Sequence, residues 1–315
     1  MSGAVIISLW NPLMSSSLSL PRRPLVVGHG VAALRLCQAA RELGILAHSA
    51  EGEPPALVAR ARALGCDALH PGEAAPSRQL ALARACREAG LRFLGQGTTL
   101  LAAMTDEASM RRLMQEAGLP LAAEASGPLV SVALLADGAG RMVHLAPRQT
   151  LPDGASLAPL PWLTPERSAY LGRLAGQAVA ALGATGLVEA RFRVFDNAVG
   201  FDSLVPGPNG EEALDESLFG LDPLVAQWRL WGGERLGERQ SGLTARGHAR
   251  LWRLILPGEA RLDGGPGVRL DGAGSGEEAR LVVWGRRPED LQGRARRVLT
   301  ALLGEEGARA HWPLE

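Results

Sequence analysis

The stretch PLVVGHGVAALRLCQAARELGILAH, residues 24–48, decides the fold class of this chain. It begins with a short apolar strand at residues 25–27, and residues 31–43 then carry apolar side chains at helical spacing. Gly44 ends this helix, and residues 45–48 form a second apolar run. A strand, a crossover helix and a second strand make a βαβ unit, which predicts two parallel strands in one sheet.

The same alternation continues toward the C-terminus. Helical spacing at residues 55–64 and 77–89 alternates with strand-like runs at residues 66–70 and 91–94. Successive parallel strands with crossover helices predict a doubly wound α/β domain. A helix over residues 106–117, with Thr105 as its predicted cap, then leads out of this domain.

Beyond this domain the pattern changes to hairpins and longer helices. The predicted elements are a hairpin at residues 130–145, a loose stretch at 147–161, a helix at 164–182, a second hairpin at 186–204 and a helix at 222–231. The last part is rich in strands and ends in a helix, with elements at residues 248–256, 268–270, 279–284 and 288–303. We therefore expect four parts: an N-terminal extension (residues 1–23), a doubly wound domain (24–126), a middle α+β domain (127–240) and a β-rich domain (241–315).

Composition excludes several classes of function. The 315 residues are 46% hydrophobic, which is enough for a buried core. Lysine plus arginine and aspartate plus glutamate are both 33, so no net charge attracts nucleic acid or an anionic membrane. All 33 of the lysine-plus-arginine residues are arginine, because the chain contains no lysine. Mechanisms that need a lysine as Schiff base, general base or phosphate ligand are therefore excluded.

The three cysteines and the N-terminus indicate a cytoplasmic protein. Cys37, Cys66 and Cys86 are far apart, and we expect them to be reduced core residues. Residues 4–10 are apolar but follow no charged segment, so residues 1–23 are expected to be a loose extension or a misassigned start rather than a signal peptide. No apolar run has membrane-spanning length.

The hairpin GLVEARFRVFDNAVGFDSLVPGPNG, residues 186–210, carries the candidate site. Glu189 lies in its first strand and Asp202 in its second, with a turn signal at residues 196–197 between them. Two carboxylates in paired strands are expected to face each other across the ladder. Residues 28–30, Gly-His-Gly, present a second possibility, because their amides suit a phosphate, but two glycines without the full G-x-G-x-x-G pattern more often form a tight strand-to-helix turn.

From about residue 24 to residue 303 the chain resembles the biotin carboxylase component of biotin-dependent carboxylases, in the ATP-grasp superfamily. The similar segments occur in the same order as in the family: LRLCQAARELGI (34–45), DALHPG (67–72), CREAGLRFLG (86–95), LLADG (134–138) with VHL (143–145), RGHA (246–249) and LVVWG (281–285). The resemblance implies a family-like N-terminal α/β domain, an ATP-grasp-like domain truncated by loss of its lid, and a family-like C-terminal domain.

The resemblance also implies roles for three residues. Glu189 and Asp202 stand where the family has its magnesium carboxylates, and Arg253 stands where it has an arginine that meets bicarbonate and carboxybiotin. These three are remnant candidates, and we expect no other catalytic residue. The alternatives are a surface or interface salt bridge for Arg253 and exposed hairpin carboxylates for Glu189 and Asp202.

Other family features have no counterpart in this chain. Glu107 takes the place of a lysine that meets the ATP phosphates, and a carboxylate repels a polyphosphate. Between residues 120 and 130 the family has a lid subdomain, for which about ten residues are too few. The family motif that begins at Asp202 continues here as SLVPGP, without the catalytic arginine and the bicarbonate base.

The leading hypothesis is a non-catalytic homologue that serves as a structural or regulatory subunit of a biotin-dependent acyl-CoA carboxylase. Its expected partners are biotin carboxylase, carboxyltransferase or biotin carrier subunits, in a hetero- or homo-oligomer. No cofactor is expected, and ATP and magnesium belong only to the alternative of an ATP-dependent carboxylase or ligase with an arginine-based site. A module that binds an anion or nucleotide without turnover, at Arg253 or at residues 28–30, and a decaying copy without a role remain open.

Overall fold

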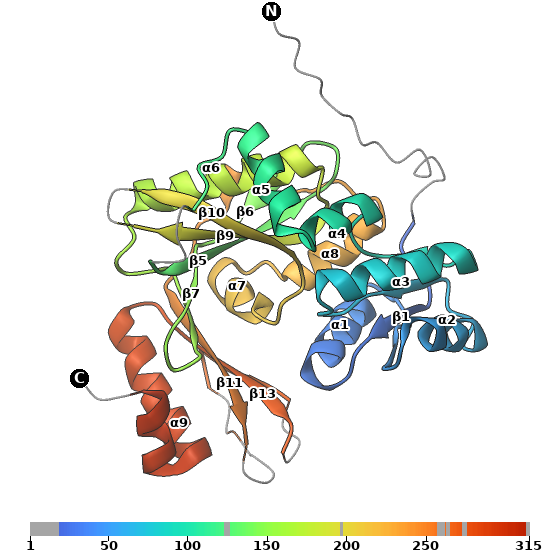
Figure 1. Cartoon of the computed structure of the whole chain (residues 1–315). Helices are drawn as coiled ribbons and strands as arrows, with labels where there is room; N and C mark the ends of the chain where they lie inside the picture. Colours follow the sequence, from blue (N-terminus) through green and yellow to red (C-terminus); the bar gives the residue numbers. More distant parts are fainter. Residues whose placement is uncertain are drawn as a thin grey trace, which may run out of the picture.

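The computed structural model describes residues 19–122, 127–195, 198–256, 262, 265–272 and 276–312. The described strands form three sheets, and Figure 1 shows the short helix α7 (Glu212–Phe219) in the centre of the molecule, between them. Most of the expected N-terminal extension, residues 1–18, lies outside the described residues.

The N-terminal sheet is parallel, as predicted, with the strand order β2-β1-β3-β4. Its elements alternate along the chain as β1 (Pro24–Val27), α1 (Gly30–Glu42), β2 (His48–Ala50), α2 (Pro54–Ala63), β3 (Ala68–His70), α3 (Pro76–Ala89) and β4 (Arg92–Phe93). Side chains alternate along β1, so Val26 packs with Leu36 of α1 on one face, whereas Leu25 packs with Leu57 of α2 on the other. Helices therefore cover both faces, which confirms the doubly wound α/β prediction.

Helices α4 (Thr98–Met104) and α5 (Glu107–Glu116) lead to the middle sheet. The sequence patterns did not predict α4, which is too short to establish a helical period. The predicted cap at Thr105 is wrong by one residue. The Thr105 hydroxyl donates back to the carbonyl of Ala102 at 2.7 Å, and the Asp106 carboxylate caps α5 by accepting from the backbone N–H of Ala108 at 3.2 Å.

The middle sheet is antiparallel, with the order β10-β9-β5-β6. Its strands are β5 (Leu129–Ala136), β6 (Met142–His144), β9 (Gly186–Val194) and β10 (Val199–Pro206). One face is covered by α6 (Pro165–Leu182), which starts at the predicted cap Thr164 and ends at Gly183. The other face packs against α8 (Pro223–Trp231). The helix α7, between these elements, was not predicted.

The C-terminal sheet has the order β12-β13-β11-β8-β7. Three strands come from the β-rich part, namely β11 (His248–Ile255), β12 (Val268–Asp271) and β13 (Glu278–Gly285). The other two, β7 (Gln149–Thr150) and β8 (Ser156–Ala158), come from the stretch predicted to be loose. The turn Gln240–Gly242 precedes β11.

Helix α9 (Pro288–His311) covers this sheet and runs past the predicted end at residue 303, with a break at Gly304. Leu291, Val298, Leu299 and Leu302 are buried against the sheet of the same chain. The apolar face of α9 is therefore used within the chain itself.

The structure also bears on the expectations about the cysteines and about membrane-spanning segments. Cys86 is buried, Cys37 and Cys66 are partly buried, and all three are free thiols. Within the described residues, no helix is both long enough and apolar enough to cross a membrane.

Candidate functional site

The candidate site lies where the loop after β10 meets β7 and the start of α7. The hairpin register does not place the two predicted carboxylates opposite each other. Glu189 pairs with Val205, whereas Asp202 falls in a β-bulge between Phe201 and Ser203 and has no partner in the ladder. The prediction that they face each other is wrong, because the pairing of Val199 with Val194 would set Asp202 opposite Arg191 even without the bulge, and the bulge leaves Asp202 without a partner. The predicted turn at residues 196–197 lies outside the described residues.

Glu189 is a buried member of a charged cluster and not an exposed carboxylate. Its side chain is 3% exposed and forms ion pairs with Arg148 and with Arg191, the latter at 2.7 Å. The side-chain amide of Asn209 also donates to it. Burial alone would raise the pKa of Glu189, but the guanidinium groups of Arg148 and Arg191 outweigh burial and hold the pKa below its usual value.

Arg148 is the centre of this cluster. Its guanidinium contacts three carboxylates: Glu189, Glu211 at 2.5 Å and Asp215 at 2.6 Å. The backbone of Arg148 is held by two 2.9 Å hydrogen bonds with Ser131 of β5, so the side chain is directed into the cluster. One guanidinium surrounded by three carboxylates leaves the group short of positive charge.

The deficit of positive charge appears at Asp215, on the first turns of α7. Burial raises the pKa of Asp215 to about 7, with Glu212 and Glu211 adding to the rise and Arg148 opposing it. The second carboxylate oxygen of Asp215 is buried without a hydrogen-bond partner. Burial and the nearby Glu73 also raise the pKa of Glu212, whose carboxylate accepts the backbone N–H groups of Asn209 and Gly210.

Arg253 reaches the same loop from β11. Its exposed guanidinium donates to the backbone carbonyl of Asn209 at 2.8 Å. Among the described residues no carboxylate lies within ion-pair distance of Arg253, so the expected surface salt bridge is not formed there. Across the ladder its neighbour Arg280 is buried and forms a bidentate pair with Glu73, at 2.8 and 2.9 Å.

The structure therefore connects two of the three predicted residues and separates the third. Asn209 binds Glu189 through its side chain and Arg253 through its backbone. Asp202 instead accepts from Arg193 at 3.2 Å and from the hydroxyl of Ser203 at 2.9 Å.

The donor set does not fit the magnesium ion that the resemblance implies. Both oxygens of Glu189 are engaged by Arg148, Asn209 and Arg191, and Asp202 is bound to Arg193. Within the described residues, no group of three or more acidic, histidine or cysteine side chains is arranged to hold a metal. Arg148 supplies the cation that the surrounding carboxylates require.

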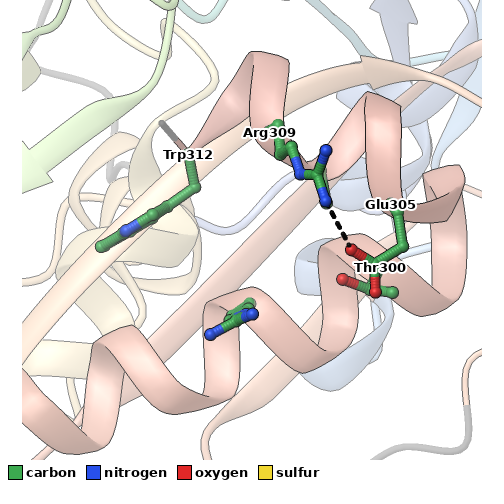
Figure 2. Close-up of a pocket in the computed structure, with 6 residues that line it drawn as sticks. Thr300, Glu305, Arg309 and Trp312 are labelled. Atoms are coloured by element: carbon green, nitrogen blue, oxygen red, sulfur yellow. Dashed lines mark hydrogen bonds and ion pairs between the residues drawn. The ribbon is translucent and has the colours of Figure 1, made fainter. Parts of the chain in front are cut away.

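Two other places, the turn at residues 28–30 and a small cavity in α9, lie outside the Arg148 cluster. In the turn at residues 28–30, the side chain of His29 pairs with Glu51 and does not cap α1. A cavity of about 20 Å³ lies at the break in α9, where Figure 2 shows Arg309 directed at Glu305 near Trp312. It has room for about one water molecule.

Sequence reasoning missed Arg148, Asn209, Glu211 and Asp215. A signal for part of this set was present, because residues 211–220 have helical spacing with a final glycine, and positions 212 and 215 share one face of such a helix. No local pattern could have shown that Arg148 meets that face, since it lies more than sixty residues away in the chain.

Comparisons with known proteins agree with this architecture. No protein-family model matches the chain. It is 23% identical to a pyruvate carboxylase subunit from Methanothermobacter thermautotrophicus over 402 residues, covering 88% of this chain and 82% of the relative. It is 24% identical to the chloroplastic biotin carboxylase of Arabidopsis thaliana, covering 69% of this chain and 57% of the relative. The 402-residue alignment exceeds the length of this chain, so the relative carries segments that this chain lacks.

Among solved structures, the biotin carboxylase domain dimer of Hydrogenobacter thermophilus 2-oxoglutarate carboxylase, in complex with MgADP, ADP and bicarbonate, is similar in fold. The TM-score is 0.80 at 20% identity, and the match covers 90% of both chains. The biotin carboxylase component of a pyruvate carboxylase gives the same score at 19% identity. The chain thus has the fold of biotin carboxylase domains and is similar in sequence, at 23–24% identity, to pyruvate carboxylase and biotin carboxylase subunits.

Proposed function

We propose that this chain is a non-catalytic biotin carboxylase-like subunit and serves as a structural or regulatory component of a biotin-dependent acyl-CoA carboxylase assembly. One observation carries the proposal: the Arg148 guanidinium is bound by Glu189, Glu211 and Asp215. Glu189 is a carboxylate that the resemblance assigns to magnesium. The buried guanidinium of Arg148 gives Glu189 a positive partner at the position where the resemblance would place the metal ion.

The position that the resemblance assigns to a phosphate-binding lysine supports the same proposal. The chain has no lysine, and Glu107 occupies the first turn of α5 next to the capping Asp106. Two carboxylates there oppose a polyphosphate. Only residues 117–128 connect α5 to β5, where the resemblance would have a lid that excludes water from the nucleotide.

Nucleotide binding is the direct test. A ligand at a hundred times its dissociation constant stabilises a folded protein by about 2.7 kcal/mol. We expect no rise in melting temperature with millimolar Mg-ATP, no bicarbonate-dependent ATP hydrolysis and no carboxylation of free biotin. Turnover that is lost in Arg253→Ala would instead establish the ATP-dependent carboxylase or ligase.

Association is the second test. The Hydrogenobacter thermophilus relative is a domain dimer, which favours pairing as the retained property. We expect the chain to comigrate with biotin carboxylase, carboxyltransferase or biotin carrier subunits from the same host in size-exclusion chromatography with light scattering. A chain that remains monomeric alone and in every co-expressed mixture would contradict the proposed role.

A ligand-binding module without turnover is the second candidate, and the exposed, carboxylate-free guanidinium of Arg253 favours it. Its signature would be thermal stabilisation by bicarbonate or ATP without hydrolysis. That stabilisation would disappear in Arg253→Ala and persist in Arg239→Ala, a matched arginine outside the cluster.

A further inference from the structure

A surface groove lies at the N-terminal ends of the parallel strands, opposite to the loop after β3 in which Glu73 pairs with Arg280. It has a volume of about 470 Å³ and is bounded by the C-terminal half of α1, the chain entering β2 and the end of α2. This volume falls within the range of roughly 300–1,000 Å³ that small-molecule sites occupy.

The titratable side chains that line the groove, apart from the thiol of Cys37, are basic: Arg23, Arg41 and His48. Across the described part of the chain, neither Arg23 nor Arg41 has a carboxylate within ion-pair distance, and Arg23 donates one bond to the carbonyl of Leu64 at 3.3 Å. The nearby Asp67 is occupied by the backbone N–H groups of Arg22 and Arg23, at 2.7 and 3.0 Å. The groove therefore presents two guanidinium groups that form no ion pair with a described residue.

The remaining lining is apolar. Ile45 is buried at its base, while Leu46 is 64% exposed and Leu64 is partly buried. Backbone hydrogen bonds from Ile45 to Ala40 and from Leu46 to the carbonyl of Arg22, both 3.0 Å, hold this wall in place. The groove is thus formed before any ligand arrives. Burial raises the pKa of the Cys37 thiol, so at neutral pH this side chain adds no negative charge to the groove.

We propose that this groove binds a small amphiphilic anion, a carboxylate or phosphate monoester with an apolar chain. The head group lies between Arg23 and Arg41, whose guanidinium groups match the geometry of both anions. The apolar body lies on Ile45, Leu46 and Leu64. This site uses none of the residues of the Arg148 cluster, so it stands or falls independently of the proposed function.

The test uses the full chain and isothermal titration calorimetry with octyl phosphate and octanoate below their micelle-forming concentrations. Inorganic phosphate and octanol separate the contributions of charge and of the apolar chain. We expect both amphiphiles to bind more tightly than either partial probe, and the better of the two identifies the head group. No saturable binding at millimolar concentration would overturn the proposal, and so would octanol binding as tightly as both anions.

Variants locate the binding on the protein. Arg41→Gln is expected to weaken binding at least about tenfold, since a charge-assisted hydrogen bond is lost. Leu46→Ser is expected to weaken the binding of octyl phosphate and octanoate while leaving the affinity for inorganic phosphate unchanged. Arg84→Gln is the matched control, because Arg84 is an exposed arginine of the same domain, on α3 and outside the groove. Equal effects of the Arg41 and Arg84 changes would show that the anions respond only to overall charge.

Discussion

Replacing Arg148 with methionine tests the central feature of the site. Methionine keeps most of the apolar stem of arginine and removes the guanidinium. Glu189 and Asp215, 3% and 2% exposed, and Glu211, 12% exposed, then lose their shared cation. Because the pKa of Asp215 is about 7, this residue takes up a proton most readily, and Glu211 has some access to water. Glu189 remains as the main uncompensated charge.

Breaking a buried ion pair from one side costs about 3–5 kcal/mol, and we expect a loss of this size in the free energy of unfolding at pH 7. Urea denaturation followed by circular dichroism measures it. Arg191→Met is the matched control. Arg191 also binds Glu189, but its side chain is 33% exposed, so its removal is expected to cost about 1 kcal/mol or less.

The loss should also depend on pH. In the Arg148→Met variant the buried carboxylates have folded-state pKa values above their unfolded values, so protonation favours the folded state as pH falls. In the wild type, Glu189 has a lowered pKa and loses its contribution as pH falls. Protonation of the variant's buried carboxylates therefore narrows the difference in unfolding free energy between the two proteins from pH 7 to pH 5, and the loss of the Glu189 contribution in the wild type narrows it further only below about pH 4.5. A loss no larger than that of Arg191→Met, or a gap that does not change with pH, would refute the interpretation of Arg148 as the compensating cation.

The remaining predictions concern packing and pH. A Cβ on Gly172 in α6 would lie 2.3 Å from the ring of His144, so Gly172→Ala is expected to cost about 1–2 kcal/mol of stability despite the better helix propensity of alanine. Gly293→Ala in α9, where a Cβ meets nothing within 4 Å, should instead stabilise the protein by up to about 1 kcal/mol. Thermal unfolding that ranks the two variants in the reverse order would contradict the packing. Burial lowers the pKa of His70 to about 4, so its contribution to stability rises with pH between about 4 and 6.5, while the raised pKa of Asp215 makes its contribution fall between about 4 and 7. Asp215→Asn should therefore make stability rise with pH across this window and His70→Asn should make it fall, as measured by urea denaturation at pH 4.5 and 6.5; parallel curves for the two variants would show that these groups do not control the pH dependence.

Local sequence patterns were sufficient for much of the fold. In the N-terminal domain the crossover helices and the buried strands β1 and β3 follow from apolar spacing, and parallel order follows from the short right-handed connections. The predicted strand at residues 45–48 is displaced, because β2 (His48–Ala50) is a mostly exposed strand without an apolar pattern. Thr164 and Gly183 likewise marked the ends of α6, because capping depends on neighbouring residues only. Short elements were missed where this local signal is weak, as in α4, in β8, which pairs with β11, and in β7, which pairs with β8.

The site depended on tertiary structure. The sequence identified Glu189, Asp202 and Arg253 through a resemblance, but the bulge at Asp202 and the burial of Glu189 follow from how β10 pairs with β9. The cluster itself joins Arg148 to carboxylates 41 to 67 positions away. Whether a charge is exposed, paired or forced to take up a proton depends on which groups surround it after folding, and neighbours brought together by packing leave no periodic pattern in the chain.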